Sequence, residues 1–134
     1  MSAGWGHDDR SAAIRVIDGA QQGGGAGATR IEHRISGADA NAYLAMGAML
    51  GAMLQGIEAG QMPPDPQDPR DPGAGERLPV EWGAAIDRFA RSDRAAQIFG
   101  QRLRDIFVAC KRQDRAAFIS HIDRFEYDTY LKLV

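Results

Sequence analysis

Residues 29–44 read TRIEHRISGADANAYL, and this stretch joins a charged strand to the start of an apolar helix. Side chains of an extended strand repeat every second residue, so Arg30, Glu32 and Arg34 share one face. Ile31 and Ile35 are predicted to point the other way, towards a core. A face with two cations around a carboxylate suits a metal-bound polyphosphate or an anionic substrate. Glu ligates Mg²⁺, and Arg grips oxyanions in a bidentate fork.

The same face has a simpler interpretation. Exposed strands carry charges that form only weak ion pairs with one another in water, and such structural pairs also shift titrations. Taken alone, the three side chains favour this solvated face over a binding site. The residues on either side of the strand are therefore needed to distinguish a binding site from a solvated face.

Length and composition limit the class of protein. The 134 residues correspond to at most one domain, and the net charge of −2 argues against a nucleic-acid-binding domain, which would show a basic patch. The single cysteine, Cys110, excludes an internal disulfide and favours a reducing compartment. No apolar run reaches the roughly 18 residues of a membrane helix, and no signal peptide is recognisable. We therefore expect a cytoplasmic protein with no membrane or nucleic-acid partner.

The pattern predicts an α+β fold that is mostly helical. Residues 5–10 have turn chemistry, and a short two-stranded antiparallel ribbon is expected from residues 12–16 and 29–35, with a Gly-rich loop at 18–27 between them. Asn41 is a candidate N-cap for a helix over 42–59. That helix is apolar around most of its circumference, which is typical of a buried helix. With few other elements to cover it, we expect part of its apolar surface to stay exposed.

The second half of the chain is predicted to form a helical cluster. All six prolines fall in residues 61–79, which favours a loop. The terminal helices are expected within 80–134, with Ser92 capping a short one at 93–99. A long helix from 101 would bury the stripe formed by Leu103, Ile106, Phe107 and Cys110. Strands and buried helix (5–60), loop (61–79) and terminal helices (80–134) are expected to form parts of a single domain.

Three stretches together resemble a known family: WGHDDRSAAIRV at 5–16, TRIEHRISGADANAYL at 29–44, and KRQDRAAFISHIDRFEYDTYL at 111–131. Their order and spacing are similar to the C-terminal part of the catalytic domain of glutamine synthetase. That family includes the γ-glutamylpolyamine ligases, and the RIEHR–SGADAN form is closer to this amine-using branch. The resemblance covers nearly the whole chain and favours the binding-site interpretation of the charged strand.

The resemblance implies a role for each matched residue. Glu32 matches a glutamate that ligates the metal ion on the ATP phosphates, and Arg34 matches the arginine that holds the carboxylate of the substrate glutamate. Arg10 matches a catalytic arginine that contacts the transferring phosphoryl group and the substrate. Arg15 matches an ATP-phosphate arginine, and Arg30 lies beside the nucleotide in such enzymes. The implied cofactors are ATP and Mg²⁺ or Mn²⁺.

The implied reaction is ATP-dependent ligation of glutamate to ammonia or a primary amine through γ-glutamyl phosphate, in a homo-oligomer. Three positions depart from the family pattern: Asp9 stands in place of Asn, Ala42 in place of Pro, and Gly27 near a nucleotide-binding Lys. Most of the family's carboxylate ligands have no counterpart here, so we expect a C-terminal fragment that is inactive alone. The alternative is a non-catalytic assembly or regulatory fragment that associates with a full-length ligase.

Overall fold

A computed structural model describes residues 3–20, 23, 25–68, 70 and 76–133 of the chain. Parts of the two predicted loops, residues 21, 22, 24, 69 and 71–75, lie outside the described residues. The chain divides into two compact units, Met1–Leu78 and Pro79–Val134. Each unit is described by itself. The fold is mixed α+β and predominantly helical, as the sequence predicts.

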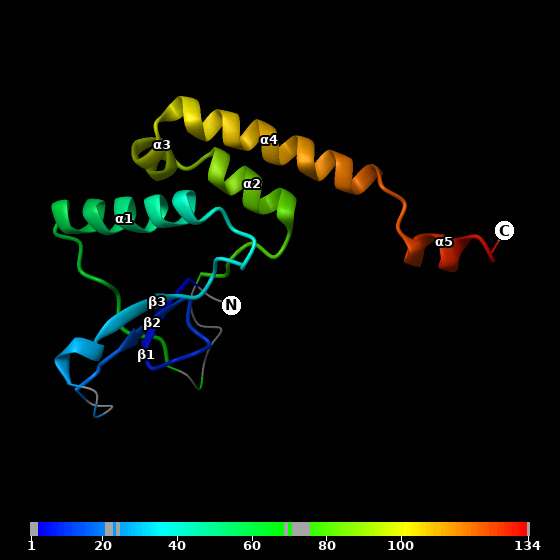
Figure 1. Ribbon diagram of the computed structural model, residues 1–134. Coiled ribbons are helices and arrows are strands. Elements are labelled where there is room, and N and C mark those ends of the chain that lie inside the picture. The colour runs from blue at the N-terminus through cyan, green and yellow to red at the C-terminus, as the bar shows by residue number, and fades with distance from the viewer. Residues whose placement is uncertain (1–2, 21–22, 24, 69, 71–75, 134) are drawn as a thin grey trace. The chain divides into compact units, whose positions relative to one another are not determined.

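The first unit contains a small sheet rather than the predicted two-stranded ribbon. Its strands are β1 (Trp5–His7), β2 (Ile14–Ile17) and β3 (Arg30–His33), in the order β1-β2-β3 (Figure 1). The predicted antiparallel pairing of β2 with β3 is confirmed, whereas β1 runs parallel to β2. Two strands alone are marginal in water, and β1 is the additional strand that the prediction of a turn at 5–10 missed.

The proline-rich segment holds β1 in place. The indole Nε1 of Trp5 donates a hydrogen bond to the carbonyl of Pro64 at 2.7 Å, and the Gln67 amide donates to the Trp5 carbonyl at 2.7 Å. Nearer the N-terminus, the Ala3 amide donates to the carbonyl of Glu76 at 2.7 Å. The bond from Gln67 satisfies a backbone carbonyl of β1, and the other two hold the Trp5 side chain and the residues before the strand. The described part of the segment is therefore a packed edge of the sheet as well as a connection.

The core of the first unit lies at β2 and the residues just before it. Ala12, Ala13 and Ile17 are buried. By contrast, Ile31 is 57% exposed and Ile35 is exposed as well, so the prediction that these two side chains enter a core is wrong. The core is centred on β2 because this middle strand pairs on both sides.

Helix α1 (Ala42–Glu58) starts where the sequence predicts. The side chain of Asn41 accepts hydrogen bonds from the amides of Tyr43 and Leu44, which confirms the N-cap. Gly60, with φ +58°, follows the C-cap Ala59. That positive φ costs glycine little, which explains the end of the helix.

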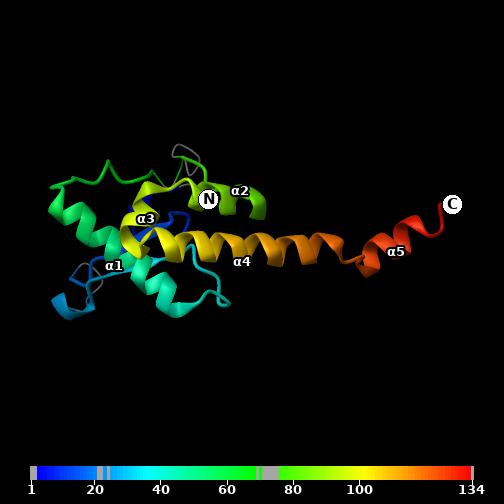
Figure 2. The same ribbon diagram turned by 90° about the horizontal axis from the view of Figure 1, so that it is seen from above.

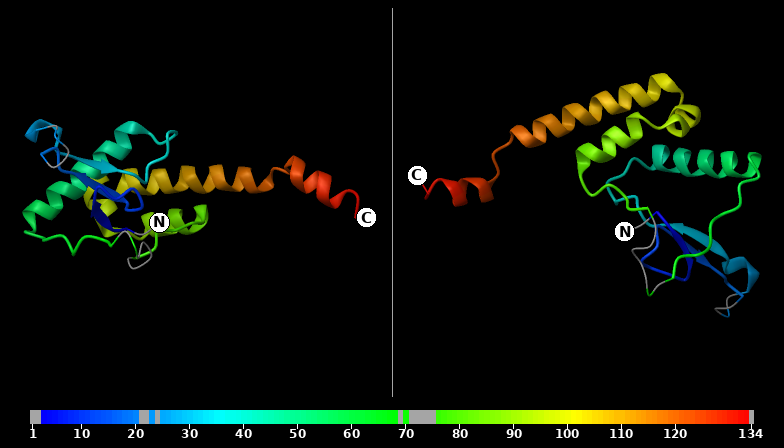
Figure 3. Two further views of the ribbon diagram at one scale, coloured as in Figure 1. Left: turned by 90° about the horizontal axis from the view of Figure 1, so that it is seen from below. Right: turned by 180° about the vertical axis from the view of Figure 1, so that it is seen from behind.

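No residue of α1 is buried, so the prediction of a buried helix is wrong. The sheet is too small to cover it: strands of three and four residues are about 10–14 Å long, against about 26 Å for α1. Leu50 is 59% exposed and Ile57 77%, together with Met46 and Met53 on the same side of the helix. The expected uncovered apolar surface is therefore present, and Figure 3 shows the helix and the strands from two further sides.

The second unit contains four helices in its described residues: α2 (Trp82–Ala90), α3 (Asp93–Phe99), α4 (Gln101–Ser120) and α5 (Arg124–Tyr130). Ser92 caps α3 by accepting from the Ala95 amide, as predicted. α4 is the longest, and α5 follows at its C-terminal end (Figure 2). Among the described residues, no helix is long and apolar enough to cross a membrane.

Helices α2 and α3 both pack on α4. The rings of Phe89 and Phe107 lie 5.4 Å apart and those of Trp82 and Phe118 lie 5.9 Å apart, both in edge-to-face geometry. Ile86 and Val108 are buried between the helices. Aromatic edge contacts and apolar burial therefore hold this unit together.

The packed face of α4 is rotated from the predicted one. Phe107 belongs to it, but Leu103, Ile106 and Cys110 are exposed, so their assignment to a buried stripe is wrong. The less exposed residues are instead Arg104, Phe107, Val108, Lys111 and Arg115. Long aliphatic stems let Arg and Lys cover an apolar surface while their charged ends stay in water.

Candidate functional site

The candidate site lies on the sheet of the first unit, where Arg15 of β2 and Glu32 of β3 are register partners. The guanidinium Nη1 of Arg15 donates to Oε2 of Glu32 at 3.1 Å. The two residues are distant in sequence and meet because β2 and β3 pair in this register. The sheet, rather than a loop, therefore positions the only carboxylate among the predicted site residues.

Glu32 also contacts two arginines near it in sequence, Arg30 in β3 and Arg34 just after the strand. Oε1 accepts from Nε and Nη2 of Arg30 at 3.3 and 3.2 Å, and Nη1 of Arg34 lies 4.0 Å from Oε2. This arrangement follows from the two-residue repeat of a strand. The structure therefore brings four predicted site residues, Arg15, Arg30, Glu32 and Arg34, into one cluster.

The arginines keep Glu32 ionised. Partial burial raises the pKa of its carboxyl group, but hydrogen bonds and charges from Arg15 and Arg30 outweigh that effect, and the pKa of Glu32 lies below its ordinary value. Its side chain remains 29% exposed, so a ligand from solution reaches it.

Arg15 has a second partner, Asp8, which follows β1. Nε of Arg15 donates to Oδ1 of Asp8 at 2.9 Å, and Nη2 donates to the same oxygen. These bonds raise the pKa of Arg15 above its ordinary value, although burial opposes the shift. The Arg15 side chain is only 13% exposed. Sequence reasoning did not single out Asp8, and nothing in the spacing of the motif marks it as a partner of Arg15.

Arg10 joins the cluster through its backbone. Nε of Arg34 donates to the carbonyl oxygen of Arg10 at 3.2 Å, and the Arg34 amide donates to the carbonyl of Ala13 at 2.9 Å. Arg10 itself is exposed. The turn that carries Arg10 is therefore fixed to the end of β3, with the Arg10 side chain at the surface.

Asp9, next to Arg10, is buried. Its Oδ1 accepts from the amide and the hydroxyl of Ser11, both at 2.7 Å. Within the described residues, its Oδ2 has no hydrogen-bond partner. This orphaned oxygen lies at the position where the family pattern has an amide in place of a carboxylate, a difference that matters for stability.

The described residues do not make a metal site by themselves. They contain no group of three or more His, Cys, Asp or Glu side chains placed to hold an ion. Both oxygens of Glu32 are already paired with arginines. Three guanidinium groups surround two carboxylates, Asp8 and Glu32, which leaves one excess positive charge. Such a surface favours an oxyanion, with Glu32 able to offer one oxygen ligand.

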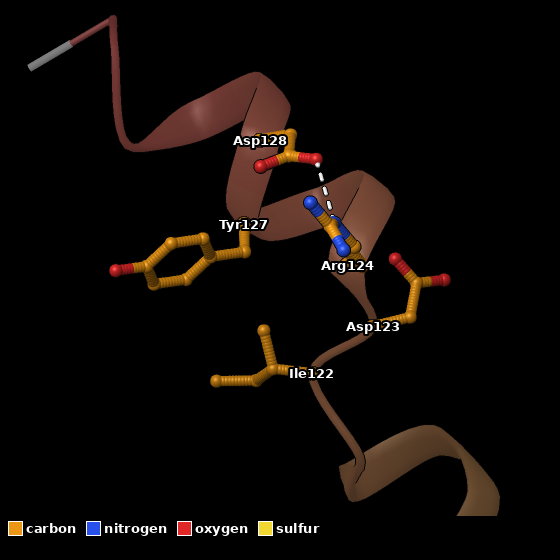
Figure 4. A pocket seen from close by; sticks show the side chains of 5 residues that line it. All are labelled: Ile122, Asp123, Arg124, Tyr127 and Asp128. Atoms are coloured by element: carbon orange, nitrogen blue, oxygen red, sulfur yellow. Dashed lines mark hydrogen bonds and ion pairs between the residues drawn. The ribbon is translucent and has the colours of Figure 1, made fainter.

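The second unit contains hollows that hold none of the predicted site residues. One is lined by Ile122 and by four residues around α5, Asp123, Arg124, Tyr127 and Asp128, as Figure 4 shows. Nε of Arg124 lies 3.4 Å from Oδ2 of Asp128 there. A more apolar hollow between α2 and α4 is lined by residues that include Trp82, Phe89 and Lys111. Neither has the charge arrangement found on the sheet.

Comparison with known proteins gives a match to one family. Residues 1–130 match the model of the glutamine synthetase catalytic domain. The chain is 30% identical to type-1 glutamine synthetase 2 of Dictyostelium discoideum and 30% identical to gamma-glutamylputrescine synthetase PuuA of Escherichia coli, in each case over 97% of its own length. It is 29% identical to a glutamate–isopropylamine ligase of a Pseudomonas species over 99% of its length. The chain spans only 25%, 27% and 29% of these three relatives.

Proposed function

The chain belongs to the family of glutamine synthetase catalytic domains, and on that premise we propose that it forms one wall of an ATP-dependent carboxylate–amine ligase site. The observation that carries the proposal is the Glu32 carboxylate held among Arg15, Arg30 and Arg34 on one face of the sheet. Phosphoryl transfer depends mainly on positioning and on stabilising charge, and such a cluster supplies both.

The proposed reaction has two steps. A γ-carboxylate oxygen of glutamate attacks the γ-phosphorus of ATP, the bond to the bridging oxygen breaks, and ADP leaves. Ammonia or a primary amine then attacks the γ-carbonyl carbon of the γ-glutamyl phosphate, loses a proton, and inorganic phosphate leaves. The second step forms the amide bond, and the phosphoryl group transferred from ATP drives it by providing a good leaving group.

Each cluster residue has a proposed role. Arg34 binds the carboxylate of the substrate glutamate, and Arg10 contacts both the substrate and the transferring phosphoryl group. Arg15 and Arg30 serve the nucleotide. Arg30 is the most accessible of the three arginines that contact Glu32, with a side chain 55% exposed against 13% for Arg15, so it is the better placed to leave Glu32 for a phosphate oxygen.

The proposed cofactors are ATP and Mg²⁺ or Mn²⁺. Glu32 is the proposed metal ligand in this chain, and the described residues offer no complete ligand set. We therefore assign no step of the reaction to the ion. The acceptor is ammonia or an amine, since the relatives include glutamine synthetases as well as enzymes named for putrescine and isopropylamine. The intact ligase is proposed to be a cytoplasmic homo-oligomer, and the single free cysteine, Cys110, suits that compartment.

The 134-residue chain alone is proposed to be inactive. A second candidate function is a non-catalytic piece that associates with a full-length ligase. The observation that favours it is the exposed apolar side of α1, formed by Met46, Leu50, Met53 and Ile57. Apolar surface of this kind marks places where another polypeptide binds.

Reconstitution with a relative separates the two candidates. The chain is mixed with E. coli gamma-glutamylputrescine synthetase from which the matching segment has been removed. The rate at which γ-glutamylputrescine forms is then measured with and without ATP. If the ligase proposal holds, the chain restores product, and Glu32→Gln or Arg34→Gln lowers the rate about a hundredfold. Arg70→Gln is the matched control, because Arg70 pairs with Asp68 in an exposed turn.

Three outcomes would revise the proposal. Association on sedimentation without product would support the assembly function instead. Full activity of the Glu32→Gln chain would contradict the role of Glu32. ATP hydrolysis by the chain alone, with Mg²⁺ and glutamate, would overturn its proposed inactivity.

A further inference from the structure

Asp8 has an unusual backbone conformation at the end of β1. Its φ is +51°, and it is the only non-glycine residue with positive φ in the described part of the chain. Asp and Asn tolerate this left-handed region better than other residues, although it still carries a cost. The Asp8 amide donates to the carbonyl of Val16 at 2.9 Å, so the conformation is fixed by the sheet. Strained residues of this kind are concentrated at functional sites.

The left-handed turn directs the Asp8 carboxylate at Arg15. Oδ1 of Asp8 accepts from both Nε and Nη2 of Arg15, which occupies one edge of the guanidinium. Nη1 donates to Glu32. The result is a chain of three charges, Asp8–Arg15–Glu32, that runs from the end of β1 across β2 to β3.

The chain offers an internal comparison. Arg70 also donates through Nε and Nη2 to an aspartate, Asp68, but its side chain is 90% exposed. Its partner is two residues away, and among the described residues no third charged side chain joins the pair. The Arg70 pair is local, whereas the Asp8 pair connects separate strands and ends on the proposed metal ligand.

We propose that Asp8 is a positioning residue: it holds one edge of Arg15, so that Nη1 is directed at Glu32 and fixes that carboxylate in the site. The inference rests on the proposed function, because it gives Arg15 and Glu32 their importance. It also limits how Arg15 meets a ligand. An oxyanion that approaches the Nε and Nη2 edge competes with Asp8, so Arg15 acts through the side that faces Glu32.

Side-chain NMR of the ¹⁵N-labelled full chain tests the geometry without requiring activity. A guanidinium held on both sides gives a slowly exchanging Nε–H signal and separate Nη signals, because rotation about the Nε–Cζ bond is hindered. In Asp8→Asn and Asp8→Gly, we expect exchange of the Arg15 Nε–H to become about tenfold faster and the Nη signals to merge. Both replacements tolerate the positive φ, so the backbone amide spectrum should persist.

Two further variants complete the test. Asp68→Asn should change the Arg70 signals and leave those of Arg15 unchanged. In Glu32→Gln, the exchange of the Arg15 Nε–H should stay slow, because the hydrogen bonds from Arg15 to Asp8 do not depend on Glu32. In a chain labelled with ¹³C as well, the side-chain carboxyl signal of Glu32 should shift in both Asp8 variants.

The inference is overturned if the Arg15 signals survive in both Asp8 variants. It is also overturned if they disappear in Glu32→Gln, or if both Asp8 variants lose the folded amide spectrum, which would make Asp8 a purely structural residue. These results are independent of reconstitution. In one combined outcome, the Asp8 variants lose the Arg15 signature while the unmodified chain fails to restore product in the reconstitution. That combination would remove the ligase proposal and leave the positioning geometry intact.

Discussion

Arg15 and Glu32 face each other across β2 and β3, with 3.1 Å between Nη1 of the first and Oε2 of the second. Both side chains are partly buried. Because each residue stands on its own strand, their contact depends on the register of the pair. A shift by one residue would place the two side chains on opposite faces and dissolve the site.

Replacing Glu32 should destabilise the first unit. Glu32→Gln removes the negative charge that separates Arg15, Arg30 and Arg34, which would leave three guanidinium groups close together. We expect a lower urea midpoint for unfolding, followed by circular dichroism. Glu58→Gln is the control, because Glu58 is an exposed residue at the end of α1. An unchanged midpoint would mean that the arginines repel one another negligibly in water.

Protonation of Glu32 should lower the free energy of unfolding in acid. The pKa of Glu32 is lower in the folded chain than its ordinary value of about 4.3. Its contribution to the free energy of unfolding is therefore fully present above about pH 4.3 and is lost as the pH falls through the lowered value. Urea titrations from pH 6 to pH 2.5 should show a smaller decrease for Glu32→Gln than for the wild type. Parallel curves would contradict the role of Glu32.

Asp9→Asn should stabilise the chain. Asp9 buries a charged carboxylate, and Oδ2 has no hydrogen-bond partner among the described residues. Asparagine keeps the oxygen that accepts from Ser11 and removes the buried charge. Burying an unpaired charge costs more than burying a neutral amide, and we expect the variant to gain about 1 kcal/mol in the unfolding free energy. Asp9→Ala, which also removes the bonds to Ser11, should be less stable than Asp9→Asn. A destabilised Asp9→Asn chain would imply a partner for Oδ2.

The N-cap of α1 provides a local test. Asn41→Ala removes the acceptor for the amides of Tyr43 and Leu44, and such a loss costs about 1 kcal/mol. Helix content by circular dichroism and the unfolding free energy should both decrease. Asn41→Asp should retain both, because aspartate caps as well and its charge suits the helix N-terminus. Equal losses in both variants would show that the amide group itself is required.

The exposed apolar side of α1 should control association. Leu50→Glu and Ile57→Glu place charges on side chains that are already exposed. We expect weaker dye binding and less self-association on sedimentation, with the unfolding free energy changed by no more than about 0.5 kcal/mol. A charge at buried Ile86 is the contrasting variant and should unfold the second unit. Unchanged dye binding in the α1 variants would show that the dye and the partner molecules bind another apolar surface.

The sequence is most informative where one local rule decides the outcome. Alternation alone predicts that Arg30, Glu32 and Arg34 share a face, and a single cap residue predicts the start of α1. Asp8 was missed because its partnership with Arg15 depends on a left-handed turn and on a parallel strand, neither of which has a local signature.

The packed face of α4 was misjudged for a related reason. Leu103 and Cys110 are apolar but exposed, while Arg104 and Lys111 lie on the packed side through their aliphatic stems. Polarity patterns treat a residue as a whole, whereas packing separates its stem from its charged end. Periodicity therefore predicted the helix correctly and its orientation about its own axis wrongly.

The hydrogen bonds from Trp5 to Pro64 and from Gln67 to Trp5 have a consequence for how this chain can vary. Surface connections usually accept insertions and deletions during evolution. Between residues 64 and 67, a change of length would pull β1 out of register and carry Asp8 with it. Homologues should therefore keep the spacing of this short stretch even where its sequence drifts, and engineered tags or inserts are better placed elsewhere.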